Sequence, residues 1–241
     1  MLELFILSLA ALLTSAFTAA LGQGGGLILM PILAGSVPGS ALIPVHGFIQ
    51  TISNGSRALL ILDHVHWPSL KPILLGVFLG SLALIPFVAT INWEWMQIFI
   101  GLFILYLTWG KGLQIRNFKF ASTKGFFVLG LLQGGLGMAV GATGPLGSAL
   151  LLRRGLSKDQ IVATNACIML STHILKVILF AGIGIAIWEY WPILLSMSLA
   201  AIAGSFLGNV IRNRINEPLF AKIFKALLTL LAIRMIAISL F

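Results

Sequence analysis

The sequence has few charged residues and few of the groups that build catalytic or metal centres. Only 9% of its 241 residues are charged, whereas soluble domains average about 25%. Its single cysteine, Cys167, excludes an internal disulfide and a cysteine-based metal site. All six acidic residues fall at the ends of apolar segments or between them. Because carboxylate proton relays and cation sites need acids within the membrane, this distribution argues against a cation transporter.

Apolar residues dominate what remains. Hydrophobic residues make up 59% of the chain, and the mean hydropathy is +1.07. A water-soluble core could not bury this much apolar surface, so we expect the lipid bilayer to be the solvent. The apolar runs are long rather than alternating, which favours helices over a barrel. The sequence therefore predicts an all-α polytopic membrane protein.

Eight apolar segments can be distinguished, and two of them are too long for a simple crossing. The eight cover residues 2–34, 39–62, 69–90, 94–112, 124–152, 158–181, 188–210 and 217–240. The first contains glycines at 22 and 24–26, and the fifth contains them at 134, 135, 137, 141 and 144. Glycine and proline disfavour a continuous helix. We therefore expect each of these two segments to consist of two short half-helices joined by an extended stretch.

The charges in the connections predict the topology. The stretches 111–124, 153–159 and 211–225 are basic, whereas 181–191 contains only Glu189. Basic connections are typically cytoplasmic. Eight simple crossings would break this rule, but it is satisfied if the first and fifth segments are hairpins that enter and leave by the same face. Both termini then lie outside.

The two halves of the chain align with each other, which predicts a duplication. The offset is 119 over residues 22–60 and 124 further on. Four pairs of polar residues match at the first offset: His46 with Asn165, Ser53 with Thr172, Asn54 with His173, and Arg57 with Lys176. The predicted units are a first repeat at 1–115, a basic cytoplasmic linker at 116–123 and a second repeat at 124–241. Each repeat has a broken hairpin and three crossings, so the halves have opposite orientations. Inverted repeats are typical of transporters.

The net charge of +9 is explained by the basic loops, so we expect no nucleic-acid partner. The N-terminus lacks the positive stretch of a cleaved signal peptide, and we expect it to remain in the mature protein. The predicted location is the cell membrane, as a multi-pass protein of a bacterial inner membrane. The lipid bilayer is then an obligatory partner, and the sequence leaves assembly as a homodimer open.

Two glycine motifs and a polar stretch carry a resemblance to a known family. They are Leu21-Gly22-Gln23-Gly24-Gly25-Gly26-Leu27, its weaker repeat Gly141-Ala142-Thr143-Gly144-Pro145, and Thr172-His173-Ile174-Leu175-Lys176. Together they resemble the sulfite exporter TauE/SafE family over essentially the whole chain. The resemblance implies a permease for sulfite, sulfonates or related organosulfur anions, with export as the direction. Thr143 and Pro145 replace two glycines of the first motif, so the two loops are not equivalent.

The glycine breaks are the first candidate binding elements. A half-helix that starts after such a break presents free N–H groups and a positive dipole end, which bind anions. Gly24, Gly25, Gly26 and Gly144 would let the backbone approach an anion closely. Gln23 and Thr143 could add side-chain donors. The alternative is close helix packing through small residues.

A polar stripe on the second and sixth segments supplies the other candidates. His46, Asn54 and Arg57 recur at helical spacing with Gln50 and Ser53. Asn165, Thr172, His173 and Lys176 partly repeat this pattern on the sixth segment. We interpret the stripe as the lining of a cavity and the two cations as groups that attract anions. The alternatives are hydrogen bonds between helices and snorkelling of Arg57 and Lys176 to the interface.

These observations predict a secondary transporter of small anions that works by alternating access. The alternative is an anion channel, which would use the same residues. An enzyme is not expected, since Cys167 near His173 is the one thin candidate for a catalytic pair. A subunit that only scaffolds a partner is disfavoured by the polar stripe. No nucleotide-binding loop is present, and we expect neither a cofactor nor a metal site.

Overall fold

The computed structural model describes residues 1–88, 90, 93–110, 122–141, 143–212 and 217–240. Regular structure in these ranges is helical, apart from one isolated bridge between Ala34 and Val37. The α-helices are α1 (Leu2–Leu21), α2 (Gly25–Leu33), α3 (Gly39–Leu60), α4 (Trp67–Val88), α5 (Trp93–Trp109), α6 (Thr123–Val140), α7 (Gly144–Arg153), α8 (Lys158–Gly182), α9 (Trp191–Ile211) and α10 (Glu217–Leu240). Two short 3-10 helices, η1 (Leu62–His64) and η2 (Trp188–Tyr190), lie in connections. The predicted all-α fold is confirmed.

Several of these helices have the length and composition of membrane spans. Within the described residues, five stretches qualify: 2–21, 67–88, 123–140, 158–182 and 188–211. Helix α3 is also long, at 22 residues, but it carries the polar stripe. The chain is therefore a polytopic helical membrane protein, as its composition predicted.

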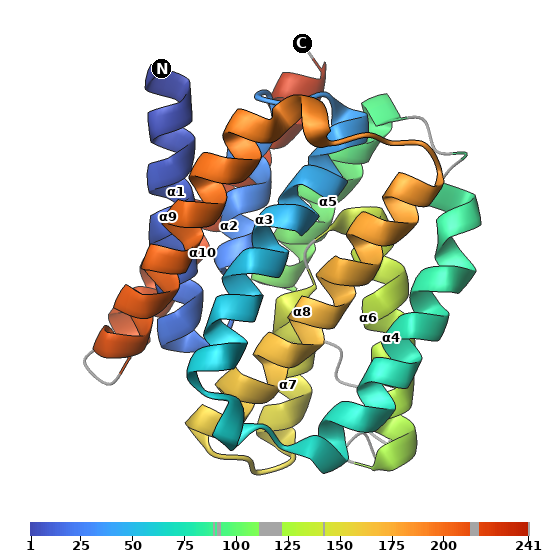
Figure 1. The fold of residues 1–241 in the computed structure, drawn as a ribbon, viewed down its shortest axis with the longest axis vertical. Helices are drawn as coiled ribbons and strands as arrows, with labels where there is room; N and C mark the ends of the chain where they lie inside the picture. The colour runs from blue at the N-terminus through green and yellow to red at the C-terminus, as the bar shows by residue number, and fades with distance from the viewer. Residues whose placement is uncertain (89, 91–92, 111–121, 142, 213–216, 241) are drawn as a thin grey trace.

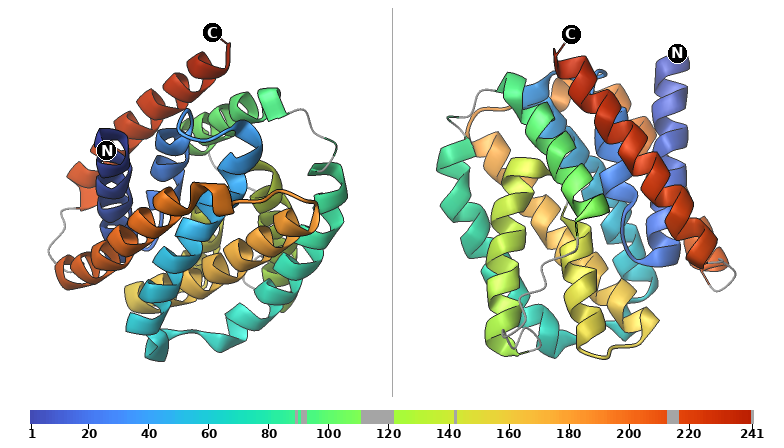
Figure 2. Two further views of the ribbon diagram at one scale, coloured as in Figure 1. Left: turned by 45° about the horizontal axis from the view of Figure 1, so that its top comes forward. Right: turned by 180° about the vertical axis from the view of Figure 1, so that it is seen from behind.

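The path of the chain contains two hairpins that enter from opposite ends of the bundle (Figure 1). Helix α1 runs away from the end at which the N-terminus lies, and the short α2 turns back toward it. Helices α6 and α7 follow the same path from the other end. Both termini lie at one end of the molecule, as the rear view in Figure 2 also shows. This path has the form that the loop charges predicted.

Each hairpin turns at a glycine in the left-handed region. Gly22 ends α1 with φ 84° and Gly141 ends α6 with φ 78°. Glycine adopts this conformation without steric cost. The predicted pairs of short half-helices are wrong in one respect, because α1 has 20 residues and α6 has 18, whereas α2 has 9 and α7 has 10. Each hairpin thus pairs a full-length helix with a half-length one.

The glycines at 134–137 lie inside α6 and do not break it. Their environment gives the reason: α6 packs on α4, and a Cβ atom on Gly134 would collide with the Val77 carbonyl oxygen. Gly76 and Gly80 on α4 meet the backbone of α6 in the same way. Small residues allow such close approach of membrane helices. For the glycines of α6, the role is therefore the alternative one, close packing of helices, and not a break in the helix.

The helix boundaries agree with the offsets of the sequence alignment. Gly25 and Gly144 start α2 and α7, and Gly39 and Lys158 start α3 and α8, so both pairs differ by 119. Trp67 and Trp191 start α4 and α9, a difference of 124. The packing of α1 on α9 also mirrors that of α6 on α4. These correspondences support the inverted repeat, which stays a prediction. Most of the predicted linker, 116–121, lies outside the described residues.

Candidate functional site

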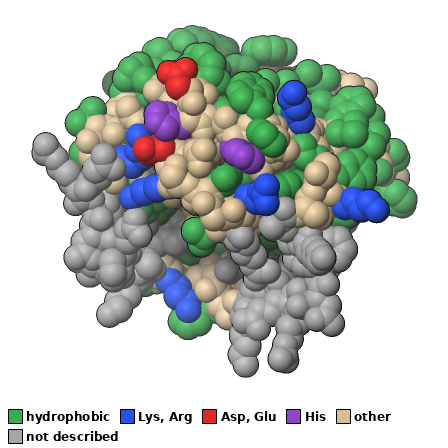
Figure 3. Space-filling view, turned by 90° about the horizontal axis from the view of Figure 1, so that it is seen from below, with side chains coloured by type: hydrophobic (Ala, Val, Ile, Leu, Met, Phe, Trp, Pro, Cys, Tyr) green, Lys and Arg blue, Asp and Glu red, His purple; other side chains and the backbone are tan. Residues whose placement is uncertain are grey.

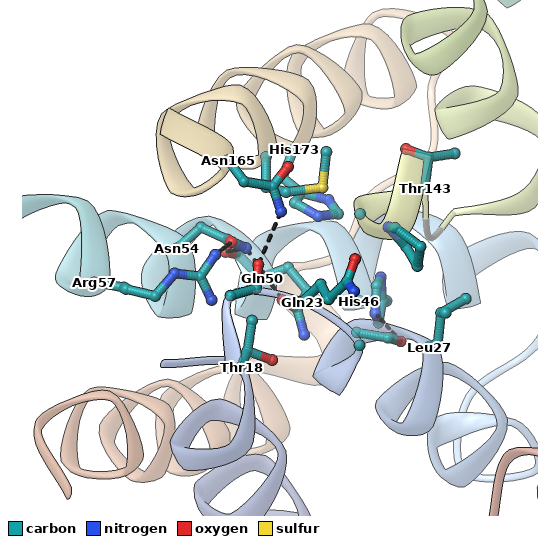
Figure 4. Close-up of a pocket in the computed structure, with 16 residues that line it drawn as sticks. Thr18, Gln23, Leu27, His46, Gln50, Asn54, Arg57, Thr143, Asn165 and His173 are labelled. Atoms are coloured by element: carbon teal, nitrogen blue, oxygen red, sulfur yellow. Dashed lines mark hydrogen bonds between the residues drawn. The ribbon is translucent and has the colours of Figure 1, made fainter. Parts of the chain in front are cut away.

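A pocket lies where the two hairpin turns meet the middle of the bundle, between α3 and α8. It contains about 340 Å³ of space not filled by atoms, part of it open to solvent. Its lining residues are Thr18, Gly22, Gln23, Gly24, Gly26, Leu27, His46, Gln50, Asn54, Arg57, Thr143, Gly144, Pro145, Asn165, Met169 and His173. Figure 4 shows that side chains from both halves of the chain converge here.

Helix α3 supplies a connected row of polar side chains. Asn54 donates from Nδ2 to the carbonyl oxygen of Gln50 at 2.7 Å and to Gln50 Oε1 at 3.1 Å. Asn54 Oδ1 in turn accepts a 2.6 Å hydrogen bond from Arg57 Nη2. The spacing of three and four residues places all three side chains on one face of the helix. The row therefore fixes the position of the guanidinium (Figure 4).

Within the described ranges, the buried guanidinium of Arg57 has no acidic partner. The residue is 2% exposed, and its Nε and Nη1 atoms have no hydrogen-bond partner among the described residues. The ion pair found within the described ranges is elsewhere, between Arg212 and Asp159 at 3.1 Å. A buried charge is costly unless it is paired. Arg57 therefore gives the pocket a positive charge with two unused donors.

Three side chains on α3 and α8 bind main-chain oxygens of the hairpin turns. Asn165 Nδ2 donates to the Gly22 oxygen at 2.9 Å, and His46 Nε2 lies 3.0 Å from the Gly26 oxygen. Lys176 Nζ donates to the Gly141 oxygen at 2.6 Å. Gly22 and Gly141 are the two helix-ending glycines, so both turns are tied to α8, and His46 of α3 adds a contact to the start of α2.

The two histidines lie close together at the pocket wall. The ring centroids of His46 and His173 are 5.7 Å apart, with the rings inclined at 72°. His173 Nδ1 accepts a 3.1 Å hydrogen bond from Lys176 Nζ, because an ammonium group can only donate. Lys176 is thus linked to the pocket through His173 and does not line it.

Ten of the thirteen residues predicted as binding groups line the pocket. They are Gln23, Gly24, Gly26, His46, Asn54, Arg57, Thr143, Gly144, Asn165 and His173. The other three, Gly25, Thr172 and Lys176, are absent from the lining. Their binding roles stay predictions.

Contacts within the helices explain why Gly25 and Thr172 lie outside the lining. Gly25 packs so tightly on α1 that a Cβ atom would collide with the Thr14 carbonyl oxygen. The hydroxyl of Thr172 donates to the Ile168 oxygen at 2.8 Å. Gly25 is therefore occupied by packing against α1, and the Thr172 hydroxyl by a hydrogen bond within α8.

The remaining lining residues were missed as site residues. They are Thr18, Gly22, Leu27, Gln50, Pro145 and Met169. Gln50 belongs to the polar stripe and could have been chosen from its spacing. The Thr18 hydroxyl accepts a 2.9 Å hydrogen bond from Gly25 N–H, a contact that no local pattern reveals. Leu27 and Met169 could not have been identified as lining residues, because apolar residues are common throughout this sequence.

The start of α2 offers fewer backbone donors than expected. The Gly25 N–H is already bound to Thr18, and in α7 Pro145 has no N–H. The two helix starts therefore leave fewer free backbone donors than the sequence predicted. No group of three metal-ligating side chains was found within the described ranges, and Cys167 there is only half-buried.

Comparison with known proteins agrees with this architecture. No curated protein sequence and no solved structure shows a significant match. A family model described as sulfite exporter TauE/SafE matches residues 7–235, nearly the whole chain. With its two broken hairpins, its polytopic helical fold and its buried cationic pocket, the chain belongs to the sulfite exporter TauE/SafE family of membrane permeases.

Proposed function

We propose that the protein is a secondary transporter that exports small anions such as sulfite, sulfonates or related organosulfur compounds. The observation that carries this proposal is the buried Arg57 guanidinium, with two unused donors and no acidic partner within the described part of the chain. Anionic oxygens are the natural partners of such a group. Membership of a permease family is consistent with transport without catalysis.

The position of the pocket favours alternating access. It lies between two broken hairpins that enter from opposite ends (Figure 1). In transporters built from inverted repeats, the substrate binds where discontinuous helices meet, and one part rocks against another around it. The ties from Asn165 and Lys176 to the hairpin turns are the contacts that such a movement would rearrange.

Counterflow in proteoliposomes tests the proposal. Vesicles preloaded with unlabelled sulfite or a small sulfonate should accumulate the labelled anion. Arg57→Gln should lower this exchange by at least about tenfold, since charge-assisted hydrogen bonds contribute about 1.5–3 kcal/mol. The control is Arg212→Gln, which removes a cation that pairs with Asp159 outside the pocket.

The outcomes separate the rival functions. Exchange that needs Arg57 but not Arg212 supports a carrier with the anion at this pocket. Anion conductance without counterflow would indicate the channel instead. Equal loss in both variants, or exchange of none of the anions, would contradict the proposed site or cargo.

A further inference from the structure

The pocket concentrates polar atoms that have no partner. Eleven buried side-chain atoms in the described part of the chain lack a hydrogen bond, and five of them belong to pocket-lining residues. Two are the donors of Arg57, Nε and Nη1. The other three are acceptors: Gln23 Oε1, His46 Nδ1 and Asn165 Oδ1. A bare anion could serve the donors, but it has no hydrogen to offer the acceptors.

The chemical identity of two of these acceptors is fixed by their other contacts. Asn165 Nδ2 donates to the Gly22 carbonyl oxygen, so the free atom of this amide is its oxygen. His46 Nε2 faces the Gly26 carbonyl oxygen at 3.0 Å and must carry the ring hydrogen there. In the neutral ring, Nδ1 is then an acceptor. The Gln23 amide has no such anchor and can present either atom.

Two of these acceptors, His46 Nδ1 and Gln23 Oε1, belong to side chains that line the same pocket as Arg57 (Figure 4). His46 is 0% exposed. The Asn165 oxygen lies against Gly147 of α7 instead, where an added Cβ atom would collide with it. A ligand that displaces solvent from a buried acceptor must replace its hydrogen bond. Leaving the acceptor unpaired lowers affinity, which is how polar sites reject analogues that lack one hydroxyl.

We propose that the pocket selects a monoanion that carries its own hydrogen-bond donor. The anionic oxygens bind Arg57, and an O–H or N–H of the same molecule donates to His46 Nδ1 or Gln23 Oε1. The hydrogen is either on the oxyanion itself, as in hydrogen sulfite, or on the organic group of a sulfonate. This inference rests on the proposed anion transport and narrows its substrate class.

A matched pair of sulfonates tests the organic donor. 2-Hydroxyethanesulfonate and propane-1-sulfonate have the same number of heavy atoms and differ by a hydroxyl in place of a methyl group. In counterflow competition, the hydroxyl compound should be about tenfold more effective, the discrimination expected when one buried polar group would otherwise be left unpaired. In a second arm, sulfite exchange relative to methanesulfonate should rise as pH falls through the second ionisation of sulfite. That rise without a hydroxyl preference would assign the hydrogen to the oxyanion.

His46→Leu is the variant that removes the acceptor, because leucine has no hydrogen-bonding group. His46→Gln is the matched control, since the glutamine amide keeps both a donor for the Gly26 oxygen and an acceptor. We expect the preference for the donor-bearing anion to shrink several-fold in His46→Leu and less in His46→Gln, while size-exclusion chromatography shows an unchanged, monodisperse protein for both.

The results distinguish the two levels of inference. Exchange of all the anions with no preference in either arm would overturn the donor requirement and leave anion transport standing. A preference that His46→Leu and Gln23→Leu both leave unchanged would overturn the assignment to these acceptors. Exchange of none of the anions would overturn the proposed transport, and the donor requirement with it.

Discussion

Arg57 and Lys176 occupy matching positions in the two halves of the sequence, yet their surroundings differ. Arg57 lines the pocket and keeps two donors unused. Lys176 is 0% exposed and uses its ammonium group on the Gly141 oxygen and His173 Nδ1. Arginine has five donors in a fixed plane, so one hydrogen bond to Asn54 leaves others free. We therefore propose that Arg57 recognises charge and that Lys176 positions a hairpin turn.

Lys176→Met should lower the maximal exchange rate more than the apparent affinity. The substitution leaves the Gly141 oxygen without its tie to α8, while the pocket lining is unchanged. We expect the maximal rate to fall by about tenfold and the half-saturating concentration to change by less than about threefold. Initial rates of exchange over a range of anion concentrations measure both. A raised half-saturating concentration at an unchanged maximal rate would instead indicate direct contact with the anion.

The two hairpins are the elements that create the pocket. Each ends a full-length helix at a left-handed glycine and starts a helix of half the length. The short helices α2 and α7 begin at these turns within the bundle, so their first residues reach its interior. Close packing then holds α2 on α1, because Gly25 lies against the Thr14 carbonyl oxygen.

Gly25→Ala should destabilise the first hairpin. A Cβ atom at this position would collide with the Thr14 carbonyl oxygen and the Thr18 hydroxyl, and overpacking of this kind costs about 1–3 kcal/mol. The matched control is Gly182→Ala at the end of α8, where nothing lies within 4 Å of the added atom. Thermal unfolding in detergent should show a lower midpoint for Gly25→Ala alone. Equal midpoints for the two variants would contradict the close approach of α2 to α1.

At the scale of the whole molecule, basic side chains gather at one end of the bundle. Figure 3 shows Lys and Arg side chains on the end opposite the N-terminus. The connections at this end include the residues around Asp63 and the turn between α7 and α8, whereas Glu189 lies in the connection between α8 and α9 at the other end. Positive residues favour the cytoplasmic side, so we expect both termini outside.

Cysteine labelling tests this orientation. In a background in which Cys167 is replaced by alanine, Asp63→Cys and Glu189→Cys place single thiols on exposed positions at opposite ends. An impermeant maleimide added to intact cells with a permeabilised outer membrane should label residue 189 and not residue 63. After the inner membrane is opened, both should react. Labelling of both residues in intact cells, or the reverse order, would contradict the predicted topology.

Much of the fold could be predicted because its signals are local. Long apolar runs, glycine breaks and basic loops each depend on a short stretch of sequence, and together they predicted a polytopic helical bundle with two hairpins. The glycines of α6 were misread as part of a break. In the sequence, a glycine that permits close packing looks the same as a glycine that ends a helix. Only the position of Gly134 against the α4 backbone distinguishes them.

The sequence by itself determined the class of protein, the two turns and the row Gln50–Asn54–Arg57, since hydropathy and helical spacing are properties of a single segment. The tertiary structure decided which polar groups meet. It placed Asn165 of α8 against the turn of the first hairpin, a contact that joins residues far apart in the chain. It also left Arg57 facing the pocket while Lys176 was bound to a carbonyl oxygen, because the partners available to a buried charge are set by the helices packed around it.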